Sequence, residues 1–66
     1  MTIQVNGNAH TASGPLTVRG LLDALGFGEK PVVVELNRRA LFPREHAETG
    51  VNEGDVLEIV QITAGG

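Results

Sequence analysis

The residues best placed to do chemistry are the last three of the sequence, Ala64-Gly65-Gly66. They follow directly on an apolar run over residues 56–62 that is typical of a β-strand. Glycine has no Cβ and reaches positive φ freely, so a segment that finishes in Gly-Gly can enter a slot too narrow for larger residues. We therefore expect the carboxylate of Gly66 to be the reactive group, with Gly65 and Ala64 threading it into the site of a partner.

The other side chains do not predict an active site. The chain has no cysteine, and so no thiol nucleophile and no thiolate metal ligand. Its two histidines, His10 and His46, lie far apart in the sequence, and this spacing does not match a metal site. There is also no glycine-rich phosphate loop with a lysine. We expect no catalytic residue, no bound metal and no bound cofactor.

Size and composition narrow the class of protein. The chain has 66 residues, which suits a single domain over residues 1–66. Its hydrophobic residues are almost all aliphatic, and its net charge is −3, so neither base stacking nor binding to a phosphate backbone is expected. No apolar stretch is long enough to span a membrane, and no leader opens the chain. We expect a cytoplasmic protein with no nucleic-acid or membrane partner.

The first half of the chain predicts a hairpin followed by a helix. Asn6-Gly7 favours a type I′ turn between strands over residues 2–5 and 8–12. Thr17 is a plausible N-cap, and Gly26 is expected just after the helix ends. We expect Gly20 to let the helix approach the sheet closely. The apolar stripe of this helix has the spacing i, i+3, i+4 and i+7 and consists of Val18, Leu21, Leu22 and Leu25.

The second half predicts a β-prone strand over residues 32–36, a short strand over residues 40–42 and a helical turn over residues 44–49. A turn at residues 52–55 then leads into the last strand. One helix and four or five strands make a two-layer α+β domain, in which the helix covers one face of the sheet.

The last strand carries apolar residues on both of its faces. Leu57 and Ile59 point one way, and Val56, Val60 and Ile62 point the other. A single helix covers only one face, which leaves two interpretations of the second set. Loops cover these residues in part, or they form a docking patch in which Val60, Ile62 and the neighbouring Glu58 contact a partner.

Taken together, these features resemble the thiamine-biosynthesis sulfur carriers, a family of small ubiquitin-like proteins, over the whole chain. The resemblance implies a β-grasp fold, in which a mixed four- to five-stranded sheet packs on one helix and the first and last strands are parallel neighbours in its middle. The matching features are the Asn-Gly hairpin, the Leu-Leu helix closed by glycine, a Val-rich strand running into Asn37, Pro43-Arg44-Glu45, residues 54–60, and Ala64-Gly65-Gly66.

The resemblance also implies a chemistry for Gly66. An adenylating enzyme of the ubiquitin-activating (E1-like) superfamily would join its carboxylate to AMP, using ATP and Mg²⁺ that this chain does not itself bind. A persulfide donor would then supply sulfur to form a thiocarboxylate, and thiazole synthase would take that sulfur for the thiazole ring of thiamine. The protein would be a carrier and co-substrate, not an enzyme.

Other identities fit the same features. The small subunit of molybdopterin synthase shares the fold, the tail and the activation chemistry that the resemblance implies. Carriers for tRNA thiolation or cysteine synthesis are similar as well. A ubiquitin-like binding module that carries no sulfur belongs to a different class of protein. Such a module would not be adenylated, whereas the carriers would be.

Overall fold

The computed structural model describes residues 1–63, and the predicted reactive segment Ala64-Gly65-Gly66 lies outside the described residues. In chain order the elements are β1 (Thr2–Val5), β2 (Asn8–Thr11), β3 (Leu16–Thr17), α1 (Val18–Ala24), β4 (Val32–Leu36), β5 (Arg39–Leu41), the 3₁₀ turn η1 (Pro43–Glu45), β6 (Gly50–Val51) and β7 (Val56–Gln61).

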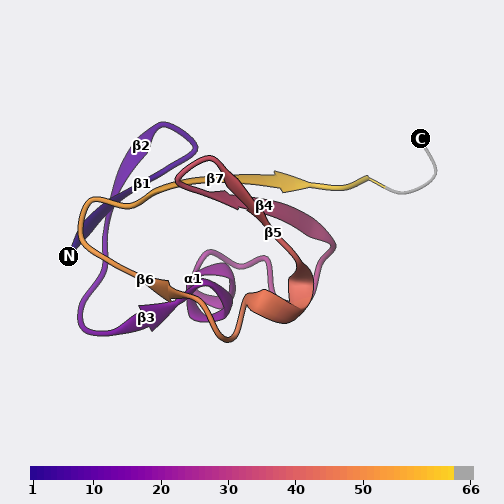
Figure 1. Ribbon diagram of the computed structural model, residues 1–66, viewed down its shortest axis with the longest axis horizontal. Helices are drawn as coiled ribbons and strands as arrows, with labels where there is room; N and C mark the ends of the chain where they lie inside the picture. The colour runs from indigo at the N-terminus through magenta and orange to yellow at the C-terminus, as the bar shows by residue number, and fades with distance from the viewer. Residues whose placement is uncertain (64–66) are drawn as a thin grey trace.

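Five strands form one mixed sheet in the order β2-β1-β7-β4-β5, and β3 and β6 form a separate two-stranded pair. β1 and β7 are parallel neighbours at the centre, whereas β1 pairs antiparallel with β2, and β4 pairs antiparallel with both β7 and β5. Figure 1 shows α1 on one side of this sheet, with β3 and β6 beside it. The architecture confirms the predicted α+β β-grasp fold.

Local chemistry explains the first turn and the helix ends. Asn6 and Gly7 have φ of 52° and 82°, as a type I′ hairpin turn requires. The Oγ1 of Thr17 accepts a hydrogen bond from the backbone N–H of Gly20 at 3.1 Å, which confirms the predicted N-cap. Gly26 has φ of 88° directly after the helix, where the left-handed conformation favours glycine.

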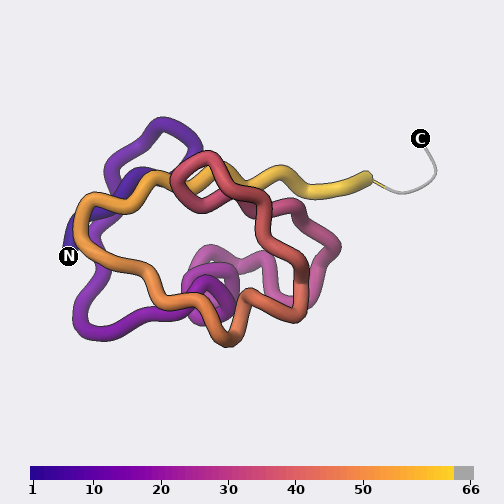
Figure 2. Tube along the Cα trace, in the orientation of Figure 1, coloured from indigo at the N-terminus to yellow at the C-terminus, as the bar shows by residue number. Residues whose placement is uncertain are grey.

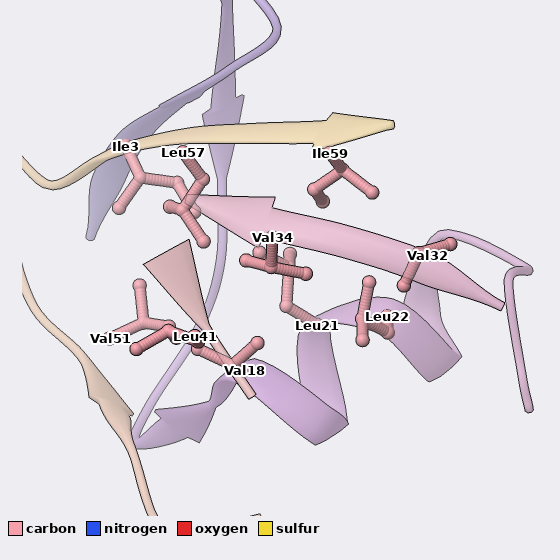
Figure 3. Packing of buried hydrophobic residues seen from close by; sticks show 10 residues of the cluster. All are labelled: Ile3, Val18, Leu21, Leu22, Val32, Val34, Leu41, Val51, Leu57 and Ile59. Atoms are coloured by element: carbon pink, nitrogen blue, oxygen red, sulfur yellow. The ribbon is translucent and has the colours of Figure 1, made fainter. Parts of the chain in front are cut away.

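The core lies between α1 and one face of the sheet. The predicted helix stripe is confirmed, because Val18, Leu21 and Leu22 are fully buried and Leu25 packs against them while partly exposed. Figure 3 shows the side chains of α1 meeting those of β4 and β7. The buried hydrophobic residues of this cluster are Ile3, Val18, Leu21, Leu22, Val32, Val34, Leu41, Val51, Leu57 and Ile59.

The prediction for Gly20 is wrong. A Cβ at this position would meet Leu16 Cδ1 at 3.3 Å and Thr17 Oγ1 at 3.4 Å, and it would meet no atom of the five-stranded sheet at comparable distance. The glycine therefore relieves crowding between the helix and its own N-terminal approach. Sheet packing is not the reason for it.

The connection between β5 and β7 also differs from the prediction. The helical turn predicted over residues 44–49 is present, but it is shorter and of the 3₁₀ type. The 3₁₀ turn starts one residue earlier, with hydrogen bonds from Glu45 N–H to Phe42 O at 2.8 Å and from His46 N–H to Pro43 O at 3.1 Å.

Some strand bounds also differ from the prediction. β5 is shifted one residue earlier, to Arg39–Leu41, and β2 ends one residue earlier, at Thr11. β3 and β6 have two residues each, too few to produce a strand pattern in the sequence.

Candidate docking face and the end of β7

β7 carries the residues that lead to the predicted reactive segment, and side chains from two turns fix its position. At its start, the amide of Asn37 accepts a hydrogen bond from Val56 N–H and donates one to Asp55 Oδ1, both at 3.0 Å. The backbone N–H of Asn37 also donates to Val56 O at 2.8 Å. The turn after β4 therefore sets where β7 begins.

A second asparagine holds the middle of β7. The parallel pairing with β1 covers only Val56 and Leu57, because β1 ends at Val5 and the chain turns away. Beyond that point the side chain of Asn6 takes the place of a neighbouring strand. Its Oδ1 accepts from Ile59 N–H at 2.7 Å and its Nδ2 donates to Ile59 O at 3.1 Å.

A backbone hydrogen bond holds the far end of the strand. Ile62 N–H donates to Pro31 O at 2.9 Å, one residue beyond the end of β7. In Figure 2 the yellow end of the described trace passes out of the body of the molecule beyond this region. The direction in which the chain approaches residue 64 is therefore fixed by the sheet itself.

The face of the sheet opposite α1 is open. Leu57 and Ile59 are buried against the helix, as predicted, and Val56, Val60 and Ile62 are 41%, 61% and 49% exposed. Each of the three side chains is therefore covered only in part, which leaves both the partial cover by loops and the docking patch open. We call the exposed side of β7, β4 and β5 the open face.

β4 and β5 extend the apolar part of this face. Val33 lies opposite Val60 in the antiparallel register and is exposed, as is Phe42 just after β5. A shallow hollow of about 320 Å³ lies among Val33, Phe42, Pro43 and Ile62. The sequence analysis missed Val33 and Phe42. The period-2 alternation through Val32, Val33 and Val34 could have placed Val33 on the open face, but only the strand register puts it beside Val60.

The open face also carries two acidic side chains directly across from each other. Glu58 of β7 lies opposite Glu35 of β4, and both are exposed. Like charges at directly opposite positions destabilise a sheet modestly. Glu58 thus lies where it was predicted, next to Val60, and Glu35 is an additional acidic residue that the sequence analysis did not single out.

The other two acidic residues near β7 serve the local structure. Glu53 Oε1 accepts a hydrogen bond from Thr2 N–H at 2.9 Å. Asp55 accepts from Asn52 N–H at 2.7 Å, in addition to the amide of Asn37. These carboxylates stabilise the turn before β7, whereas Glu58 is available to a partner.

His46 is the one buried ionisable side chain in the described part of the chain, with 3% of its surface exposed. Burial, and then the positive charge of Arg19, lower the pKa of His46 below its ordinary value, against an opposing effect of Glu45. Among residues 1–63, no three His, Asp or Glu side chains are grouped so that they could hold a metal ion. The same residues contain no helix of the length and hydrophobicity that a membrane span needs.

A mixed sheet with parallel first and last strands, packed on one helix and open on its other face, defines a ubiquitin-like β-grasp domain. The model of the ThiS family matches residues 3–66, and the chain belongs to this family. A crystal structure titled thiamine biosynthesis protein (ThiS), from Geobacter metallireducens, superposes with a TM-score of 0.85 at 36% identity, covering all of both chains.

Two kinds of curated relatives are similar over the whole chain. A thiazole synthase from Paramagnetospirillum magneticum is 38% identical over 66 residues, and the match covers 20% of that protein. A thiazole synthase from Magnetococcus marinus is 35% identical, again over 20% of its length. The chain thus spans about one fifth of these relatives. A protein named ycf40 from Porphyra purpurea is 35% identical, and there the match covers 93%.

Proposed function

We propose that this protein is a sulfur carrier for thiamine biosynthesis and that the carboxylate of Gly66 carries the sulfur. The observation that supports this most is the match to the ThiS family model, which extends through residue 66. The geometry of β7 agrees with it. The last backbone anchor is Ile62, so residues 63–66 can extend at most about 14 Å beyond it.

The proposed chemistry begins with activation of an unreactive group. A terminal carboxylate is ionised at neutral pH and is a poor electrophile. Its oxygen attacks the α-phosphorus of ATP on an adenylating enzyme, pyrophosphate leaves, and Mg²⁺ shields the phosphate charge. The product is the acyl-adenylate of Gly66, whose carbonyl carbon is now open to attack.

Sulfur enters in two further steps. The terminal sulfur of a persulfide donor attacks the carbonyl carbon, and AMP leaves. A thiol then attacks the other sulfur of the S–S bond, forms a disulfide with the donor and releases the thiocarboxylate on Gly66. The chain contributes a positioned carbonyl to this sequence and no general base, so it acts as a co-substrate of partner enzymes. This ATP-dependent activation would occur in the cytoplasm.

We propose that the open face docks on thiazole synthase, with Val60 and Ile62 as the apolar contacts and Glu58 as the charged one. Exposed apolar side chains in a continuous patch are typical of interaction surfaces. The choice of partner is supported by the two thiazole synthases that contain a segment similar to this chain. Docking there would bring residues 64–66 to the site that consumes the sulfur.

The intact mass of the protein tests the carrier function. The protein is incubated with the adenylating enzyme, ATP, Mg²⁺ and a persulfide donor, and its mass should rise by the difference between sulfur and oxygen. A variant with one alanine added after Gly66 is the matched control and should keep its original mass. If neither adenylate nor thiocarboxylate forms on the parent protein, the carrier proposal is wrong and a binding module without carrier chemistry becomes the better interpretation.

A further inference from the structure

A second hollow lies near the end of β7, next to the apolar hollow of the open face, with which it shares Val32, Pro43 and Ile62. Its volume is about 310 Å³. Arg19 comes from α1, Lys30 and Pro31 from the loop before β4, and His46 from the residue after η1. The residues that the argument uses are Arg19, Glu29, Lys30 and His46 on its polar side and Pro31 and Ile62 on its apolar side.

Two buried nitrogen atoms on this polar side lack hydrogen-bond partners among residues 1–63. They are Nε2 of His46 and Nε of Arg19. The rest of the Arg19 guanidinium is occupied, since Nη2 donates to Gly28 O and lies 3.4 Å from Asp23 Oδ1. A buried N–H of a charged group is costly to leave without an acceptor. The polar side of the hollow therefore has one donor, Nε–H of Arg19, and one imidazole nitrogen, Nε2 of His46, whose hydrogen bonds a polar ligand would complete.

The residues that line the hollow carry more positive than negative charge. Arg19 and Lys30 contribute two positive charges and Glu29 one negative charge, while Asp23, which pairs with Arg19, lies outside the lining. The backbone N–H of Arg19 donates to His46 O at 2.8 Å, which holds the two residues side by side. The pKa of His46 is lowered first by burial and second by the positive charge of Arg19. Pro31 and Ile62 form an apolar wall opposite these groups, which suits a ligand with an apolar portion next to its charge.

We propose that this hollow binds a small organic anion, either a phosphate ester or a carboxylate, with its oxygens directed at Arg19 and Lys30 and its apolar portion against Pro31 and Ile62. This site is independent of the sulfur chemistry proposed for Gly66, because none of its polar residues belongs to the open face. Ile62 is among the residues that line both hollows. A bound anion would therefore lie next to the docking surface at the end of β7.

Titration of the full ¹⁵N-labelled chain tests the site, with AMP, orthophosphate and acetate as the three probes. Saturable shifts of the amide signals of residues 19, 30 and 46 with AMP support the phosphate ester, and tighter binding of AMP than of orthophosphate supports the role of the apolar wall. Saturation by acetate alone supports a carboxylate. If none of the probes gives saturable shifts at these residues, the proposal is wrong.

Three exposed residues provide charge variants that leave the core intact. Lys30→Gln should weaken binding of the effective probe about two- to fivefold, and Glu29→Gln should strengthen it about as much, as expected for removal of one nearby exposed charge. Arg38→Gln, in the turn between β4 and β5, is the control and should leave the affinity unchanged. If all three variants change the affinity in proportion to net charge alone, the binding is non-specific and the site is refuted.

Discussion

The amide of Asn6 connects the first hairpin to the strand that leads to Gly66, and replacing it tests the description of β7. The side chain makes two hydrogen bonds with the backbone of Ile59, at 2.7 and 3.1 Å, in a partly buried position. Asn6 also has φ of 52°. Asn6→Gly keeps that backbone conformation available and removes both hydrogen bonds, so it isolates the contribution of the amide.

The expected loss of stability follows from the two hydrogen bonds that Asn6→Gly removes. A hydrogen bond contributes roughly 0.5–1.5 kcal/mol to the free energy of unfolding, so Asn6→Gly should lower it by about 1–3 kcal/mol. In a domain of this size, each kcal/mol corresponds to a fall in melting temperature of about 4–8 °C. Asn6→Asp should be destabilising as well, because it keeps an acceptor for Ile59 N–H and places a carboxylate oxygen against Ile59 O.

Thermal unfolding followed by circular dichroism measures the loss, and hydrogen exchange at the Ile59 amide locates it. Exchange at Ile59 should accelerate more than exchange at the buried β4 residue Val34. Asn8→Ala is the matched control, since Asn8 is an exposed asparagine in the same hairpin. If Asn6→Gly melted within a degree or so of the control variant and Ile59 exchanged as in the parent, the role assigned to the Asn6 amide would be refuted.

Four further predictions have defined outcomes. Leu22→Ala should cost about 2–5 kcal/mol in chemical unfolding because Leu22 is fully buried, whereas Leu25→Ala should cost clearly less. Because the pKa of His46 is lowered in the native state, the unfolded state binds a proton more readily than the native state does. The free energy of unfolding, measured by urea titration, should therefore fall as the pH drops below 6.5. His46→Gln should make this dependence of the free energy of unfolding on pH less steep. Val60→Asp should weaken binding to thiazole synthase in calorimetry without lowering the melting temperature. Deletion of Gly66 should abolish ATP–pyrophosphate exchange with the adenylating enzyme at unchanged stability.

Each of these has a result that would contradict it. Equal losses from the two leucine variants would contradict the full burial of Leu22 and the partial burial of Leu25. A parent protein whose stability is flat below pH 6.5 would exclude His46 as a source of acid sensitivity. Loss of folding on Val60→Asp would remove this residue from the docking face. Normal exchange without Gly66 would exclude its carboxylate as the activated group.

Sequence reasoning succeeded where the relevant interactions are local. The Asn6-Gly7 turn, the Thr17 cap and the helix stripe each depend on residues a few positions apart, and all three are confirmed. It failed where a short element depends on a distant partner. β3 and β6 exist because Leu16 pairs with Val51, and neither strand is long enough to show a pattern of its own.

The residues of the candidate site also fall into those that a local sequence pattern predicts and those that depend on distant pairing. The alternation of β7 was enough to place Val60 and Ile62 on the face opposite Leu57, because that depends only on the two-residue period of a strand. Glu35 and Val33 join them through the register between β4 and β7, which no local pattern specifies. For the same reason Asn6 was interpreted as a turn residue only, although its amide bonds a residue 53 positions away.

These anchors explain how so small a domain would present the segment that we propose carries the sulfur. The two asparagine amides and Pro31 O hold β7 from its first residue to the residue just beyond its end. Most of the entropic cost of aligning the chain up to Ile62 is then met when the domain folds. Thr63 is exposed and lies beyond the last of these anchors. A partner that recognises the open face can therefore locate the Gly66 carboxylate to within the reach of four residues, about 14 Å, before it makes any contact with that group.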